Sequence, residues 1–220
     1  MIRTSPLEAA LAPRKPRREV AHGMRVATGF DHEGDPVRLA LADCSFLPRT
    51  GLKGPGAADW LAANGVTVPA GANRWGRLHG GGLIGRLATS EFFIEDGPSG
   101  DTGARVAAAL GHGSPGVYPV LRQDAALALV GRDALEVLAQ TCSFPFAGTA
   151  ADELVMTSIA GVSALVIPQR YEDNPLYRIW IDPTFGTFLF RTLLEITEEL
   201  GGGPLGLRRL YPELQSTREP

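Results

Sequence analysis

The chain has 220 residues, of which 44% are hydrophobic and 20% are charged, and its formal net charge is −3. A chain of this length can bury most of its apolar surface in one core or in two small ones. The net negative charge argues against a general nucleic-acid binder, because such proteins usually present a basic face to the phosphates.

Compartment and membrane signals are sparse. No segment approaches the roughly 20 apolar residues that a membrane-spanning helix requires. The apolar run 7–12 is too short for a signal peptide, and Pro13 interrupts it. The two cysteines, Cys44 and Cys142, lie far apart and form no Cys-x-x-Cys pair, so neither a metal cluster nor a disulfide framework is expected. The sequence therefore predicts a cytoplasmic protein with no membrane partner.

Residues 1–35 are predicted to form a flexible basic arm, because nothing in them is periodic enough to fold alone. The segment carries four closely spaced basic residues between prolines: Arg14, Lys15, Arg17 and Arg18. Two interpretations stay open. The segment is either a solvated, disordered tail or an arm that docks on an acidic surface of a partner.

The folded domain is predicted over residues 36–205, with one unit possible over 36–116 and a second over 117–205. Hydrophobic alternation, helix-start signals and glycine stops define its elements. In the first unit they are strands at 39–41 and 46–52, a helix after Pro55 that ends at Asn64-Gly65, a loop over 71–82 that contains Trp75, a hairpin of 83–88 with 92–95, and a helix over 104–110 with Asp101 as its N-cap.

The second unit has the same alternation of strands and helices. Its expected elements are a hairpin over 118–130 that turns at Gln123-Asp124, a helix over 133–140, a hairpin of 154–159 with 162–167 around Gly161, a strand at 177–181, and a helix after Asp182-Pro183 that ends at 201–203. The predicted inward face of the last helix comprises Phe185, Phe188, Leu189, Thr192, Leu193 and Ile196. Asp182 is its expected N-cap, and residues 206–220 are expected to be a peripheral tail.

One stretch of sequence recurs at an offset of 77 residues. Residues 52–57 with Leu61 match residues 129–134 with Leu138, and each copy is a strand that ends in glycine and enters a short helix. Such junctions are common, so the match is either chance or a true structural duplication. A duplication predicts a pair of related α+β units with mostly antiparallel sheets, not a doubly wound parallel sheet.

Residues 111–116 fit the pattern Gly-x-Gly-x-x-Gly of dinucleotide-binding proteins. That motif works because a strand leads into it and a helix begins there, so that backbone N–H groups meet the pyrophosphate. Here a helix is expected before the glycines and a strand after them. We therefore interpret 111–116 as a helix-to-strand turn and expect the chain to bind neither flavin nor NAD.

Two further patterns resemble parts of hydrolase sites. His79-Gly80-Gly81-Gly82 resembles an oxyanion-hole loop, which also needs a Gly-x-Ser-x-Gly elbow between a strand and a helix. The run beginning Gly161-Val162-Ser163 has Leu165 in place of the last glycine, and Ser114 has His112 in place of the first. Neither serine is therefore expected to be a nucleophile.

The remaining reactive side chains show no convergent pattern. The four histidines, His22, His32, His79 and His112, have no metal-ligand spacing. The acidic pairs Glu95-Asp96 and Glu172-Asp173 lie beside Gly or Asn-Pro and are interpreted as turn residues. Cys142 is interpreted as a small buried hydrophobe. We thus predict no catalytic, cofactor-binding or metal-binding residue in this chain.

Residues 83–201 resemble the gamma subunit of heterotetrameric sarcosine oxidase and its relatives, including N-methylglutamate dehydrogenase. No piece is a catalytic signature, so the resemblance rests on order and spacing. Its four pieces are 83–87 with 90–94, 126–138 followed by Thr141-Cys142, the apolar pair around Gly161, and 177–190.

This resemblance implies a fold related to the glycine cleavage T-protein, an aminomethyltransferase that binds tetrahydrofolate. It also implies an accessory, cytoplasmic gamma subunit beside alpha, beta and delta-type subunits. FAD, FMN, NAD and tetrahydrofolate would then belong to those partners, whose complex demethylates an N-methyl amino acid such as sarcosine. Two alternatives stay open: a stand-alone folate-binding or aminomethyltransferase-like protein, and a free-standing module with an unrelated ligand.

Overall fold

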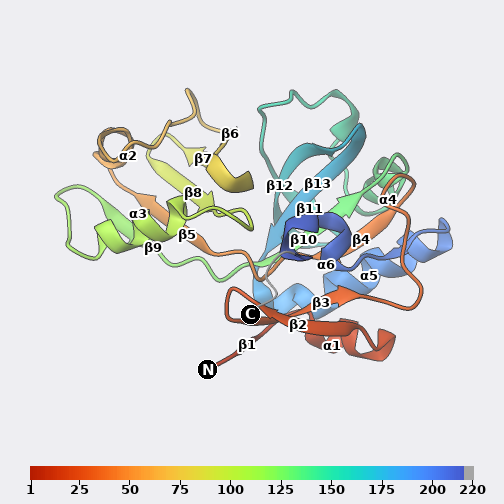
Figure 1. Ribbon diagram of the computed structural model, residues 1–220. Helices are drawn as coiled ribbons and strands as arrows, with labels where there is room; N and C mark the ends of the chain where they lie inside the picture. Colours follow the sequence, from red (N-terminus) through yellow and green to blue (C-terminus); the bar gives the residue numbers. More distant parts are fainter. Residues whose placement is uncertain (216–220) are drawn as a thin grey trace. The chain divides into compact units, whose positions relative to one another are not determined.

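The computed structural model describes residues 1–215 and contains two compact units (Figure 1). Unit 1 comprises Met1–Phe46, Asp124–Ala151 and the chain from Val155 onward, and unit 2 comprises Leu47–Gln123 and Asp152–Leu154. The chain therefore leaves unit 1 after Phe46 and returns to it at Asp124, whereas the sequence placed the division at residue 116. The predicted mixed α+β class with mostly antiparallel sheets is confirmed.

Unit 2 is a five-stranded antiparallel sheet in the order β6-β7-β8-β5-β9. Its elements are β5 (Arg49–Lys53), α2 (Ala57–Ala63), β6 (Arg74–Arg77), η2 (His79–Gly81), β7 (Leu83–Ala88), β8 (Glu91–Glu95), α3 (Thr102–Leu110) and β9 (Tyr118–Val120). Leu61 of α2 and Val106 of α3 join Leu52, Ile84 and Phe92 of the sheet in one core, so both helices cover the same face.

The larger sheet of unit 1 has six strands in the order β11-β12-β13-β10-β4-β14. Its strands and helices are β4 (Ala40–Asp43), β10 (Ala125–Val130), α4 (Ala134–Thr141), η3 (Phe146–Gly148), β11 (Val155–Ile159), β12 (Val162–Tyr171), β13 (Asn174–Ile181), η4 (Pro183–Phe185), α5 (Gly186–Glu199) and β14 (Gly203–Pro204). Leu127, Ile179 and Leu193 belong to its core, which α4 and α5 cover.

Two predicted connections are wrong. Residues 118–130 form no hairpin, because β9 pairs with β5 in unit 2 while β10 pairs with β13 and β4 in unit 1. Trp75 does not lie in a loop. It belongs to β6, which is the edge strand beside β7, and its side chain is buried. β6 and β9 are both short, and for β9 the pairing with the distant β5 decides the structure more than local sequence does.

The prediction of a flexible arm is also wrong. Residues 3–29 contain β1 (Arg3–Thr4), α1 (Glu8–Leu11), η1 (Ala12–Arg14), β2 (Arg17–Ala21) and β3 (Met24–Gly29), and the three strands form their own sheet. Leu7 and Leu11 are buried in the core of unit 1. The backbone carbonyl of Ala9 accepts a hydrogen bond of 2.9 Å from the Arg191 guanidinium on α5. The hydrophobic residues of this segment follow no helix or strand period, because the segment is held by its packing on α5, a helix far along the chain.

The basic residues of this segment bind acids within unit 1. Arg18 donates to Glu8 at 2.5 Å, and the nearest nitrogen of Arg17 lies 3.6 Å from Asp31. Arg14 donates to both carboxylate oxygens of Glu198. These ion pairs give no support to an arm that docks on an acidic partner surface.

The C-terminal segment is more than a peripheral tail as far as the structure describes it. Residues 207–215 form α6 (Leu207–Leu210) and η5 (Pro212–Gln215), and Leu207 and Leu210 are buried. The Tyr171 hydroxyl donates a hydrogen bond of 2.8 Å to the backbone carbonyl of Arg209. Residues 216–220 of the predicted tail lie outside the described part of the chain.

The sequence repeat is a structural duplication. The series β5-α2-β6-β7-β8-α3-β9 and β10-α4-β11-β12-β13-α5-β14 follow the same order, and in each sheet the first strand pairs antiparallel with the last strand of a three-stranded meander. The matched glycines have nearly the same conformation, with φ of 129° at Gly54 and 119° at Gly131. A side chain is excluded at both, because a Cβ would lie 2.2 Å from the Gly116 carbonyl oxygen and 2.3 Å from that of Arg38.

This duplication predicts that substitution of either glycine destabilises the protein in the same way. Gly54→Ala and Gly131→Ala should each lower the free energy of unfolding by at least about 2 kcal/mol, since each combines a strained φ with a backbone clash. Gly148→Ala is the control, because a Cβ there meets nothing within 4 Å, and it should change stability by less than about 0.5 kcal/mol. Urea unfolding followed by circular dichroism measures all three. Wild-type stability for either junction variant would contradict the equivalence.

Asp182 caps η4, the short turn that leads into α5, whereas the N-cap of α5 itself is Phe185 and has no side-chain cap. The predicted inward face of α5 is only partly right, because Leu189 and Leu193 are buried but Phe185 and Phe188 are not. The backbone N–H and the hydroxyl of Thr184 both donate to the Asp182 carboxylate, at 2.8 and 2.6 Å, and the hydroxyl contributes most to holding the pKa of Asp182 below its usual value. Phe185 and Phe188 are 51% and 52% exposed. The buried residues of α5 are Gly186, Leu189, Phe190, Leu193, Leu194 and Thr197. Among residues 1–215, no helix is both long and apolar enough to cross a membrane.

Candidate functional site

The Gly-x-Gly-x-x-Gly run lies where the sequence analysis placed it, between a helix and a strand. It follows α3 and precedes β9, and Gly113 and Gly116 adopt φ of 75° and 71° to make the turn. No helix begins at these glycines, so their backbone N–H groups lack the aligned helix end that a pyrophosphate requires. The interpretation as a helix-to-strand turn is confirmed.

The two hydrolase-like patterns lie on different units. The glycines after His79 form η2, where a Cβ at Gly80 would lie 2.5 Å from the backbone nitrogen of Gly100, so this run serves close packing of two loops. Ser163 is exposed on β12 just after the tight turn of a hairpin, and no helix follows it. Ser163 therefore does not occupy a nucleophile elbow.

The pair Glu95-Asp96 was interpreted wrongly as turn residues, since both side chains are buried. Glu95 accepts from the buried Arg49 at 2.6 Å across β8 and β5. Asp96 accepts from the backbone N–H groups of Gly103 and Ala104 at 2.7 and 3.1 Å. Asp96 thus caps α3 in place of the predicted Asp101, which makes no side-chain cap and whose carboxylate contacts Arg105 one turn along.

The other acidic pair and the reactive residues are spread over the fold. Glu172 has φ of 51° in the turn between β12 and β13, which confirms the turn interpretation for that pair. Cys44 is buried, and Cys142 is half-buried at the end of α4 with its sulfur 3.4 Å from the Thr157 hydroxyl. Within residues 1–215, no three His, Cys, Asp or Glu side chains gather closely enough to hold a metal ion.

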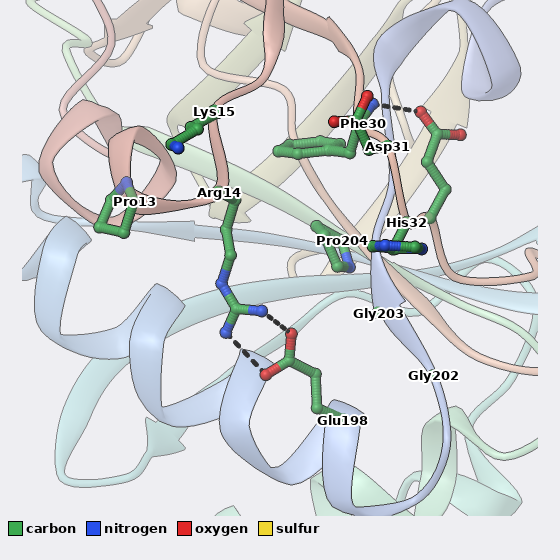
Figure 2. Close-up of a pocket in the computed structure, with 11 residues that line it drawn as sticks. Pro13, Arg14, Lys15, Phe30, Asp31, His32, Glu198, Gly202, Gly203 and Pro204 are labelled. Carbon is green, nitrogen blue, oxygen red and sulfur yellow. Dashed lines mark hydrogen bonds and ion pairs between the residues drawn. The ribbon is translucent and has the colours of Figure 1, made fainter.

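One candidate site is a polar hollow of about 440 Å³ in unit 1. Three segments that lie far apart in the sequence form it (Figure 2). Pro13, Arg14 and Lys15 come from the end of η1, residues 30–33 follow β3, and Glu198 and residues 202–204 come from the end of α5 and from β14. We refer to this set of eleven residues as the polar hollow.

Each of the three carboxylates of the polar hollow contacts an arginine, at different distances. Arg14 crosses it to Glu198, with Nη2 2.7 Å from Oε2, as Figure 2 shows. Glu33 accepts from the Phe30 backbone N–H at 2.8 Å and lies 3.7 Å from Arg209. Asp31 makes a longer contact with Arg17. Each carboxylate therefore has a cationic partner, although these pairs are partly exposed and each contributes little to stability.

Sequence reasoning missed the polar hollow because its parts have no common spacing. Arg14 and Lys15 were assigned to an arm, and Glu198 lay outside the predicted inward face of the helix after Asp182. One signal was present in the glycine run 201–203, since glycines mark close approaches of the backbone. A Cβ at Gly202 would indeed lie 2.5 Å from the Leu39 carbonyl oxygen.

A second cavity of about 160 Å³ lies between α4 and η3 in unit 1. Its walls are apolar and come from Leu135, Leu138, Ala139 and residues 144–147. It has no polar side chain among its lining residues, so it can accept only a small apolar group.

No protein-family model matches the chain, and no curated protein matches it in sequence. The fold is similar to glycine cleavage system aminomethyltransferase T from Bartonella henselae, with a TM-score of 0.73 and 18% identity over 94% of this chain and 60% of that one. It is also similar to a chain of heterotetrameric sarcosine oxidase from Corynebacterium sp. U-96 in complex with pyrrole 2-carboxylate, with a TM-score of 0.67 and 20% identity over 90% of this chain and 96% of that one. The chain thus spans 60% of the aminomethyltransferase, and the predicted T-protein-like fold is confirmed.

Proposed function

We propose that this chain is an accessory subunit, of the gamma type, in a multi-subunit flavin-dependent oxidoreductase. The complex would demethylate an N-methyl amino acid such as sarcosine in the cytoplasm. Alpha, beta and delta-type subunits would carry FAD, FMN, NAD and tetrahydrofolate, and the one-carbon unit would pass to the folate there. This chain would contribute a folded surface for assembly.

One observation carries the proposal. The chain and the sarcosine oxidase chain match over nearly the whole of both, 90% and 96%, with a TM-score of 0.67. Similarity at 20% identity establishes a common fold, and a fold alone does not imply a function. The ordered pieces of sequence that resemble the gamma subunit add support of a different kind, because they rest on residues and not on the backbone; they fall on β7, β8, β10, α4, β11, β12, β13 and α5.

A second candidate is a stand-alone aminomethyltransferase-like protein that binds tetrahydrofolate. The higher TM-score of 0.73 with the aminomethyltransferase favours it. One observation weighs against this candidate: the match spans 60% of that enzyme, so whatever the other part of the enzyme does would have to be done by residues outside the matched fold.

Deletion of the gene in the source organism tests the proposal. We expect extracts of the deletion strain to lose flavin-dependent oxidation of N-methyl amino acids, because an accessory subunit is needed for assembly, and we expect a plasmid copy to restore it. The purified chain should bind neither flavin nor tetrahydrofolate at micromolar concentrations. Unchanged oxidation in the deletion strain, together with tight tetrahydrofolate binding by the isolated chain, would favour the stand-alone candidate.

A further inference from the structure

The side of α5 that faces away from the core of unit 1 carries a regular stripe of side chains. They recur at intervals of three or four residues, which places them on one face of the helix: Phe185, Phe188, Thr192, Glu195 and Glu199. None of them is buried, whereas the core contacts of α5 come from Leu189 and Leu193 on the other side. We refer to these five residues as the outer stripe.

The outer stripe begins with an aromatic end. Phe185 and Phe188 are 51% and 52% exposed, and residues three apart on a helix are neighbours, so the two rings form one exposed apolar patch. The Thr192 hydroxyl donates to the Phe188 carbonyl at 3.1 Å, so its donor is already used within the helix. A second surface that removes the two rings from water therefore gains free energy without leaving this hydroxyl unsatisfied.

The outer stripe finishes with an acidic end. Within residues 1–215, the structure records no ion pair or side-chain hydrogen bond for Glu195 or Glu199. They lie four residues apart, so their like charges are neighbours, and Glu199 is the last residue of α5, where the helix dipole disfavours a negative charge. The two carboxylates therefore destabilise the isolated helix slightly, and a basic surface would reverse this effect.

The charges around α5 do not neutralise this acidic end. The arginines that the structure records on α5 or in contact with it are each balanced by an acid outside the outer stripe: Arg14 by Glu198, Arg38 by Asp133, and Arg191 in net charge by Asp182. The guanidinium of Arg191 also donates to the Ala9 carbonyl at 2.9 Å. The charge left on this face is that of Glu195 and Glu199.

We propose that the outer stripe docks on a larger subunit of the proposed complex. The surface of that subunit presents apolar side chains to Phe185 and Phe188, and arginine or lysine side chains to Glu195 and Glu199. This docking face rests on the proposed function, since its partner is a subunit of that complex. It goes further by assigning the surface through which the chain assembles and the chemistry of the surface that receives it.

A second copy of the chain does not match the outer stripe. In an antiparallel pair of stripes, Phe185 and Phe188 would face the glutamates of the other copy, and in a parallel pair the glutamates would face one another. Neither arrangement gives Glu195 or Glu199 a cation, and burial of an unpaired carboxylate is costly. A basic partner subunit therefore fits both ends of the stripe, and a second copy fits neither end well.

The aromatic end is tested with tagged full-length variants that replace the chain in the deletion strain. Native mass spectrometry of the purified material gives the ratio of assembled to free chain. Phe188→Ala should lower this ratio by about ten-fold or more, because exposed aromatics often dominate an interface, while the melting temperature of the isolated chain stays within about 2 °C of the wild type. Tyr118→Ala is the matched control, because Tyr118 is an aromatic residue of unit 2 that is 57% exposed, and it should change the ratio by less than about two-fold.

The acidic end predicts effects of opposite sign on stability and on assembly. Replacement of both glutamates, Glu195→Gln with Glu199→Gln, should keep or raise the melting temperature by about 1 °C, because it removes a repulsion within the helix. The same double variant should lower the ratio of assembled to free chain by roughly three-fold or more at low salt, and added salt should weaken wild-type assembly more than its own. Asp59→Asn on α2 is the control for loss of an exposed acid and should have less than about a two-fold effect.

The outcomes separate the docking face from the proposed function. If the wild type assembles and either Phe188→Ala or the double glutamine variant assembles equally well, the docking face is wrong and the proposed function stands. A wild-type chain that carries no flavin-bearing subunit would contradict both. A dimer of the isolated wild-type chain in sedimentation equilibrium that Phe188→Ala abolishes would assign the face to a second copy and overturn the proposal.

Discussion

Phe190→Ala should lower the free energy of unfolding by about 3–5 kcal/mol, whereas Phe188→Ala should change it by less than about 0.5 kcal/mol. The two residues have the same side chain and lie two positions apart on α5, so their helix propensities cancel in the comparison. Phe190 is 0% exposed within the core of unit 1, while Phe188 is 52% exposed. Truncation of Phe190 leaves a cavity in the core, whereas truncation of Phe188 removes a ring that is half in contact with water.

Urea unfolding of both variants, followed by circular dichroism, measures this difference. A loss of several kcal/mol is a large part of the stability of a domain of this size, so Phe190→Ala should also reduce the soluble yield. Equal stability of the two variants would contradict the buried face described for α5. A larger loss for Phe188→Ala would restore the face that the sequence predicted.

Leu7→Ala should lower the free energy of unfolding by about 2–5 kcal/mol, and deletion of residues 1–20 should cost more than the single substitution. Leu7 is 0% exposed, and the Cβ that an alanine would add at Gly186 on α5 would lie 2.9 Å from Leu7 Cδ2. The deletion also removes Leu11, which is 2% exposed, and uncovers the face of α5 that carries Gly186.

Ile2→Ala is the matched control for Leu7→Ala, because Ile2 belongs to the same segment and is 55% exposed. We expect its melting temperature to stay within about 2 °C of the wild type. If deletion of residues 1–20 leaves the melting temperature unchanged, the segment is an arm after all and its packing against α5 is wrong.

The wrong assignment on α5 shows that the sequence predicts the helix but not which of its faces is buried. The predicted inward face began at Phe185 and Phe188, whereas the buried face begins at Gly186. Leu189 and Leu193 belong to both faces. At the start of the helix the two faces differ by one residue, which is a rotation of about 100° around the helix. The sequence favoured the aromatics because nothing in it showed that Leu7 packs where Gly186 lacks a side chain.

Local signals predicted the elements that depend on few residues. The strand, glycine and helix at Gly54 and again at Gly131 follow from turn chemistry and short-range hydrophobic spacing, and so does the cap at Asp182. Pairing and packing between segments that lie far apart in the sequence were not predictable in this way. The separation of β9 from β10 and the three segments of the polar hollow depend on such pairings.

The proposed role as an accessory subunit is tested most directly by native mass spectrometry of material purified through a tag on this chain from its source organism. We predict a single species that contains this chain together with larger flavin-bearing subunits and that oxidises an N-methyl amino acid. A species of 23.4 kDa plus the tag, with no other chain attached, would contradict the proposal.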